Sequence, residues 1–157
     1  MTHETTHNGH HSRQQRSSVM TIAKKECVVV ASVLMDDGKP GPNICTALAY
    51  APTYWESPEA GKLAEAIVKV VGRGFRPSAT MVKAMLEECY KPWIDHPTFK
   101  DGLPLSCAES VAAELLPVYR RRRIAAAIAD AYQAVIEHPE STVKVARALV
   151  VTLGDLA

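Results

Sequence analysis

The segment from Ser106 to His138 constrains the fold of this chain more than any other part of the sequence. Its pattern is helical throughout, and Ser106 with Glu109 matches the S-x-x-E signature of a capping box at its start. A continuous helix of this length would extend about 50 Å. Pro117 interrupts the pattern, because proline lacks a backbone donor and clashes with the carbonyl four residues earlier. We therefore expect a kink or a break at Pro117.

A second helix is expected to return alongside this segment. The stretch "HPES" predicts a tight turn, and a last helix should run from Ser141 to Leu153 and close at Gly154. Two helices joined by a short turn pack as an antiparallel pair. Residues 106–157 are therefore predicted to form a helical hairpin.

The residues before this hairpin predict a compact bundle of shorter helices. The chain is 47% hydrophobic but only 6% aromatic, which favours helix over sheet. Ser57 and Pro58 mark the start of the best-defined helix, and Gly72 or Gly74 marks its end. Helices are expected at residues 22–35, 42–50, 58–72 and 78–90, with a loop over 91–105. The predicted fold class is all-α, with a helical bundle over 22–105 followed by the protruding antiparallel hairpin.

The polar start of the chain, residues 1–21, lacks any hydrophobic period and is predicted to be a disordered tail. Its histidines His7, His10 and His11 allow a loose metal site, but the composition favours a solvated segment. We find neither a secretory signal pattern nor an apolar run long enough to span a bilayer. The expected location is therefore the cytoplasm, without membrane contact.

Charge and cysteine content argue against several classes of function. Eighteen basic and seventeen acidic residues give a formal net charge of +1, so no global field draws the chain to nucleic acid. The four cysteines form no CxxC pair and have no histidine at metal-ligand spacing, which argues against a zinc site. We expect them to be free or buried thiols. They are Cys27, Cys45, Cys89 and Cys107.

Motifs for phosphate binding or catalysis do not occur in a suitable context. Gly38-Lys39 is followed by Pro40 where a P-loop needs Ser or Thr, and neither HExxH nor G-x-S-x-G occurs. Glu87 and Glu88 are adjacent and therefore project from different sides of a helix, which is poor geometry for an acid–base pair. The sequence predicts no enzyme and no cofactor.

Four consecutive arginines, Arg120–Arg123, lie in the middle of the long helical segment. Successive residues of a helix are about 100° apart, so the cluster surrounds one turn and does not line one face. No carboxylate three or four positions away can neutralise these side chains. Three interpretations stay open: a solvated cluster, contact with another protein or subunit, and direct contact with nucleic-acid phosphates.

Several segments, taken in order, carry a resemblance to a known family. They are "ECVVVASVLMDD", the pair Tyr54–Trp55 before a helix containing Leu63, Ala66 and Ile67, the helix start from Pro77 to Val82, and the long helix with Arg120 to Ile124. Over about residues 22–154 this order resembles the N-terminal domain of DnaB-like replicative helicases. The chain departs from that pattern where "IDHPTFKDG" replaces a glycine pair, and at Pro117.

The resemblance implies a hairpin that pairs neighbouring subunits and a bundle onto which primase docks, with ATP hydrolysis in a separate domain. We predict a non-catalytic interaction and oligomerisation module in DNA replication that self-associates through the hairpin and docks primase or a helicase loader. DNA would be reached only indirectly, through a helicase. The alternative is a small helical regulator whose arginines bind nucleic-acid phosphates. The predicted partner-binding residues are Arg120, Arg121, Arg122, Arg123, Ile124, Ile128, Tyr132 and Val135.

Overall fold

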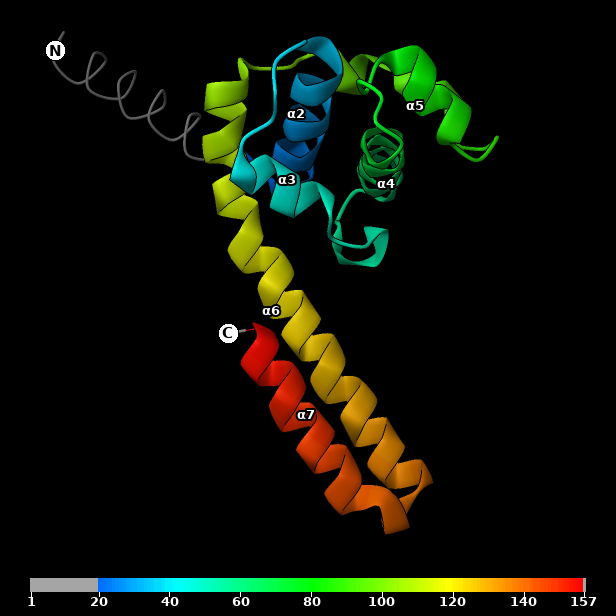
Figure 1. Ribbon diagram of the computed structural model, residues 1–157, viewed down its shortest axis with the longest axis vertical. Coiled ribbons are helices and arrows are strands. Elements are labelled where there is room, and N and C mark those ends of the chain that lie inside the picture. The colour runs from blue at the N-terminus through cyan, green and yellow to red at the C-terminus, as the bar shows by residue number, and fades with distance from the viewer. Residues whose placement is uncertain (1–19, 157) are drawn as a thin grey trace, which may run out of the picture.

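The structure of the chain is a computed structural model, and it describes residues 20–156. Within this range it contains six α-helices and four short 3-10 helices and no strand, which confirms the all-α prediction. Figure 1 shows a cluster of helices α2 to α5 beside the first part of α6, from which the rest of α6 protrudes together with α7. The tail prediction, including His7, His10 and His11, falls outside the described residues.

Helix α2 (Ile22–Met35) is the central element of the bundle and has the predicted bounds. The hydroxyl of Thr21 accepts a hydrogen bond from the Lys24 amide at 3.1 Å and so caps its start. Every residue from Glu26 to Val33 is buried, because α4, α6 and the segment around residues 97–99 pack around the helix. Enclosure on all sides explains why β-branched residues such as Val28 occupy a helix here: burial outweighs their modest helix propensity.

Helix α4 (Pro58–Gly72) also has the predicted bounds. The Ser57 hydroxyl accepts from the Ala60 amide at 3.1 Å, and Gly74 adopts a positive φ of 83° just beyond the end. Gly61 lies in this helix because the short 3-10 helix η1 (Pro52–Tyr54) packs against it. A Cβ at residue 61 would lie 3.1 Å from the Pro52 Cα, so the close approach requires glycine.

Two helices of the bundle are shorter than the sequence predicts. Helix α3 (Pro42–Leu48) stops two residues before the expected end, ahead of the turn that leads into Pro52. Helix α5 (Ala79–Met85) stops five residues early, because Leu86 adopts an extended conformation. The chain then forms η2 (Lys91–Asp95) and η3 (Pro97–Phe99), where a loop was expected. The early turn allows three apolar side chains to enter the core, namely those of Leu86, Ile94 and Phe99.

The sequence predicted a kink or a break at Pro117. Helix α6 (Leu105–Glu137) is continuous through Pro117, so the break is wrong. Proline leaves the Ala113 carbonyl without its helical donor, but both residues are exposed and water can hydrate that carbonyl. The helix changes direction where it leaves the bundle (Figure 1). Its first part belongs to the bundle, because four of its residues are buried there. They are Ala108, Ala112, Leu115 and Tyr119.

The predicted capping box at the start of α6 is also wrong. The helix begins at Leu105 after Pro104, and no side chain caps it. Glu109 instead accepts hydrogen bonds from the amides of Asn43 at 2.7 Å and Ile44 at 3.0 Å, at the start of α3. The carboxylate thus satisfies free donors of a helix that is distant in sequence, and it fastens α3 to α6.

Helix α7 (Thr142–Leu156) returns alongside the second half of α6, and η4 (Pro139–Ser141) connects them (Figure 1). It continues through Gly154, where the sequence predicted its end. Contacts between α6 and α7 are numerous, whereas no contact of comparable extent joins α7 to α2, α3, α4 or α5. Within residues 20–156, the hairpin therefore touches the bundle mainly through the continuity of α6.

Candidate interaction surfaces at the hairpin

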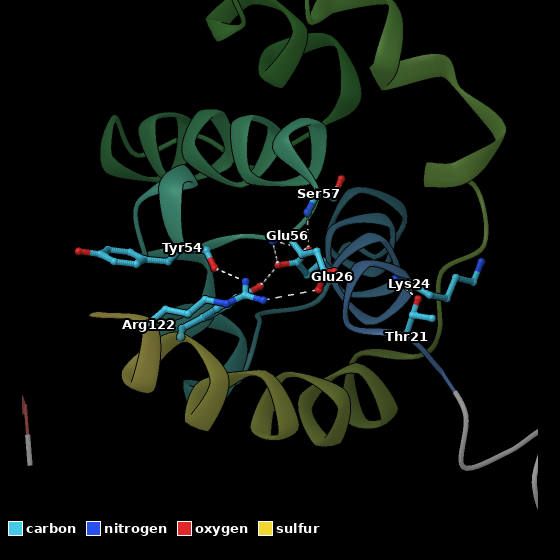
Figure 2. Close-up of polar contacts among 8 residues, drawn as sticks. Thr21, Lys24, Glu26, Tyr54, Glu56, Ser57 and Arg122 are labelled. Carbon is cyan, nitrogen blue, oxygen red and sulfur yellow. Dashed lines mark hydrogen bonds and ion pairs between the residues drawn. The ribbon is translucent and has the colours of Figure 1, made fainter. Parts of the chain in front are cut away.

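Arg122 is the one member of the arginine cluster that the structure attaches to the bundle. Its guanidinium donates to the Tyr54 carbonyl at 2.7 Å and lies 3.5 Å from the Glu56 carboxylate (Figure 2). Both partners belong to the connector between α3 and α4. No carboxylate of α6 lies three or four positions from Arg122, and the connector supplies one in its place. Half-buried Arg122 therefore attaches the base of the hairpin to the bundle.

A buried carboxylate lies beside this contact and was not identified from the sequence. Glu26 has 0% of its surface exposed and accepts hydrogen bonds from the amides of Glu56 and Ser57 at 2.8–3.1 Å (Figure 2). It also accepts from the Tyr119 hydroxyl at 2.6 Å. These donors stabilise the carboxylate inside the protein and join α2, the connector and α6 at one point.

Tyr119 connects α6 to this junction through both its hydroxyl and its aromatic ring. Its ring is fully buried, stacks on Trp55 with a centroid distance of 5.3 Å, and lies 5.3 Å from the Tyr50 ring. Burial and the hydrogen bond to Glu26 raise the pKa of the Tyr119 hydroxyl well above its usual range. The hydroxyl therefore stays protonated and keeps donating to Glu26. The sequence analysis identified Trp55, as part of an aromatic pair before a helix, but it did not identify Tyr119. Glu26, the hydrogen-bond partner of Tyr119, lies 93 residues earlier in the chain, so no local pattern connects the two.

The other three arginines remain available at the surface. Arg120, Arg121 and Arg123 are exposed, and no carboxylate of residues 20–156 lies within ion-pair distance of them. The Nε of Arg121 donates to the Pro117 carbonyl of its own helix at 3.4 Å. The cluster therefore separates into one arginine bound to the bundle and three that face solvent.

Arg123 borders a hollow of about 400 Å³ at the base of the hairpin, which we call the notch. Helix α3 and the connector after it form the other wall. No carboxylate lines the notch, so the charge of Arg123 is not compensated there. The lining residues are Thr46, Ala49, Tyr50, Ala51, Tyr54 and Arg123.

The four apolar residues predicted to bind a partner divide into two pairs. Ile124 and Val135 are half-buried, at positions that face α7. Ile128 and Tyr132 are 49% and 68% exposed. The hairpin also exposes other large apolar side chains, which are not among the predicted partner-binding residues. They are Ile136 on α6 and Val143, Val150 and Val151 on α7.

Most of these exposed residues lie on one side of the hairpin. Successive residues of a helix are about 100° apart, so positions 128, 132 and 136 lie to one side of the contact line between α6 and α7. On the antiparallel α7, positions 143 and 150 lie to that same side, whereas the opposite side is polar. We call the first side the apolar face, formed by Ile128, Tyr132, Ile136, Val143 and Val150; the second carries Asp130, Gln133, Glu137, Lys144 and Asp155.

No group of three or more His, Cys, Asp or Glu side chains within residues 20–156 is arranged to hold a metal ion. All four cysteines are free thiols, and Cys27 is the buried one. Burial raises the pKa of the Cys27 thiol, so it stays protonated and unreactive. No described helix combines the length and apolar character needed to cross a membrane.

No family model, curated protein or solved structure matches this chain. The resemblance to the N-terminal domain of DnaB-like helicases therefore remains an expectation from the sequence.

Proposed function

We propose that this protein is a non-catalytic interaction module that self-associates through the apolar face of its hairpin. The observation that carries the proposal is the exposure of five large apolar side chains on one side of two helices, a side that no other element of residues 20–156 covers. An exposed apolar surface rimmed by polar residues is typical of a protein contact site. Burying it stabilises a complex by about 25 cal/mol per Å² of apolar surface removed from water.

A second copy of the same chain is the partner that fits this face. Two hairpins that meet by their apolar faces around a two-fold axis form a four-helix bundle, in which each face covers the other. The polar residues of the opposite side, such as Gln133 and Lys144, remain in water in this arrangement. The two compact bundles lie beyond the base of the hairpins and do not obstruct it.

The experiment is the molar mass in solution, measured by light scattering over a range of concentrations. The wild-type chain should form a dimer or a larger assembly built from dimers. Ile136→Asp places a charge in the apolar face and should yield monomers. Gln133→Asp adds the same charge one turn away on the polar side, and it should leave the assembly intact.

A wild-type chain that stays monomeric at high concentration contradicts the proposal. Equal dissociation by Ile136→Asp and Gln133→Asp also contradicts it, because the effect would then come from added charge and not from the apolar face. Far-UV circular dichroism of each variant separates loss of assembly from loss of folding.

The setting we propose for this module is DNA replication, with primase or a helicase loader as the second partner. Support comes from the resemblance in segment order to the N-terminal domain of DnaB-like helicases, together with a bundle and projecting hairpin of the kind that resemblance implies. In this setting, ATP hydrolysis and DNA unwinding belong to a separate ATPase domain or chain, and the present chain supplies assembly.

Binding measurements with purified proteins test this setting. The chain should bind the primase or loader of the same organism in isothermal titration calorimetry, and it should hydrolyse no ATP by itself in the presence of single-stranded DNA. Absence of binding to both proteins removes the replication setting but leaves the self-association result untouched.

A further inference from the structure

The base of the hairpin presents concentrated positive charge, most of which no acidic residue of the described range 20–156 neutralises. From Leu115 to Ala129 the sequence holds four arginines and no acidic residue, in a chain whose net charge is only +1. The bundle neutralises one of them, through the contact of Arg122 with Glu56. The remaining arginines attract anions to this part of the surface.

The notch gives this charge a shaped surface next to it. Tyr50 and Tyr54 contribute to its wall, and their rings meet edge to face with a centroid distance of 6.1 Å. Both side chains are half-buried, and Tyr54 extends outward from the connector (Figure 2). The Tyr50 ring also packs against Tyr119, whereas Tyr54 has no further ring contact among the described residues. A ring with one edge-to-face partner keeps at least one face free of that partner, so Tyr54 offers aromatic surface to a flat ligand.

Aromatic surface beside an arginine is the combination that proteins use for single-stranded nucleic acids: bases stack on the rings and phosphates contact the cation. We propose that the notch binds one nucleotide unit, with its phosphate on Arg123 and its base against Tyr54 or Tyr50. The volume of about 400 Å³ suits a ligand of this size.

The geometry of this site differs from that of an arginine-rich helix that binds double-stranded DNA in the major groove. A helix that reads the major groove presents its contact residues along one face, whereas Arg120–Arg123 surround a full turn. A notch with one arginine needs only one phosphate and one exposed base, which a single strand or a free nucleotide supplies. The site also lies away from the apolar face, so it does not depend on self-association.

Fluorescence anisotropy with a labelled oligothymidine of about ten nucleotides tests the site at low salt. Arg123→Ala should weaken binding by about tenfold and lower the salt slope by about 0.7, the value for one phosphate contact on a single strand. Tyr54→Leu should weaken binding by about five- to hundredfold through loss of stacking. The Tyr54 carbonyl, which Arg122 uses, is retained in that variant.

Arg121→Ala is the matched control, because it removes the same charge two residues away and does not alter the notch lining. It should change the affinity less than twofold. Ile128→Asp, which disrupts the apolar face, should bind the oligonucleotide as the wild type does, so failure of this proposal and failure of the proposed self-association are distinguishable.

Thymidine monophosphate and inorganic phosphate as competitors identify the ligand. Tighter binding of the oligonucleotide assigns a strand, and equal binding of the monophosphate assigns a free nucleotide; both outcomes support the site. The proposal is overturned if no labelled oligonucleotide or monophosphate binds at low salt, or if Arg121→Ala weakens binding as much as Arg123→Ala. It is also overturned if Tyr54→Leu has no effect and inorganic phosphate competes fully, because the surface then binds anions alone.

Discussion

The bundle and the hairpin are both helical, but they differ in how their side chains are covered. Helix α2 is buried over eight consecutive residues, Glu26 to Val33, and every buried side-chain polar atom of the described residues has a hydrogen-bond partner. Between Ile124 and Leu156, by contrast, Leu156 is the only buried residue of the described chain. The bundle buries its own core, whereas the hairpin leaves several large apolar side chains in water, among them Tyr132 and Val150.

Helix formation and helix burial are therefore separate properties. The bundle gains stability from long-range contacts such as the bond between Tyr119 and Glu26. The hairpin has one helix–helix contact and a short turn, and its remaining stability must come from α6 or from another molecule.

Replacing the buried carboxylate should disrupt the bundle most. Glu26→Ala removes the acceptor of the Tyr119 hydroxyl and of the Glu56 and Ser57 amides, so it should lower the free energy of unfolding by about 3–5 kcal/mol. Urea unfolding followed by tryptophan fluorescence measures this loss. Glu65→Ala, which removes a half-buried carboxylate of α4 that lies 3.8–3.9 Å from Lys62 and Lys69, is the control and should change stability by less than about 1 kcal/mol. A loss below about 1 kcal/mol for Glu26→Ala would show that the junction is not structural.

Matched leucine truncations compare the two regions directly. Leu63 on α4 is fully buried, so Leu63→Ala should cost about 2–5 kcal/mol in urea unfolding. Leu149 on α7 is half-buried in the contact with α6, so Leu149→Ala should cost about 1 kcal/mol when the chain is monomeric. Equal losses at the two positions would contradict the contrast between a closed bundle and an open hairpin.

Removal of one hydroxyl tests the link between α6 and the bundle. Tyr119→Phe keeps the stacking on Trp55 but loses the bond to Glu26, so it should cost about 1.5–3 kcal/mol at neutral pH. Folding raises the pKa of Tyr119, so the unfolded chain releases that proton first as the pH rises. Wild-type stability should therefore fall above about pH 10, more steeply than that of Tyr119→Phe. Parallel slopes for the two proteins between about pH 9 and 11 would rule out this linkage.

The smallest effect is expected where α6 passes from the bundle to the hairpin. Pro117→Ala restores a backbone donor to the Ala113 carbonyl at an exposed position, so it should raise stability by about 1 kcal/mol. Thermal unfolding measures the gain, and small-angle X-ray scattering reports whether the bend in α6 changes. A destabilised variant would mean that the bend is needed for packing of the first part of α6.

Local signals in the sequence predicted much of the fold. The bounds of α4 follow from the cap residue Ser57 and from the proline that starts the helix, and those of α2 follow from a helix-compatible apolar run. Signals that depend on distant residues failed. Glu109 matches a capping box for its own helix, yet it caps α3, because tertiary packing brings the free donors of that helix within reach.

The surfaces were predicted in part. The apolar periodicity after Arg123 indicated the hairpin, but it could not separate Ile124, which faces α7, from Tyr132, which faces solvent. That distinction needs the position of the second helix. Arg122 and Arg123 are neighbours of the same type, and only the connector around Tyr54 makes one a structural contact and leaves the other in the notch.

Because α6 is one continuous helix shared by both regions, it also connects them mechanically. A partner bound at the tip of the hairpin acts on a helix that is held at its other end by the turn from Tyr119 to Arg122. This turn contacts Glu26 and the connector. A displacement of the hairpin is therefore passed along α6 to the contacts that Tyr119 makes with Glu26 and Arg122 makes with the Tyr54 carbonyl.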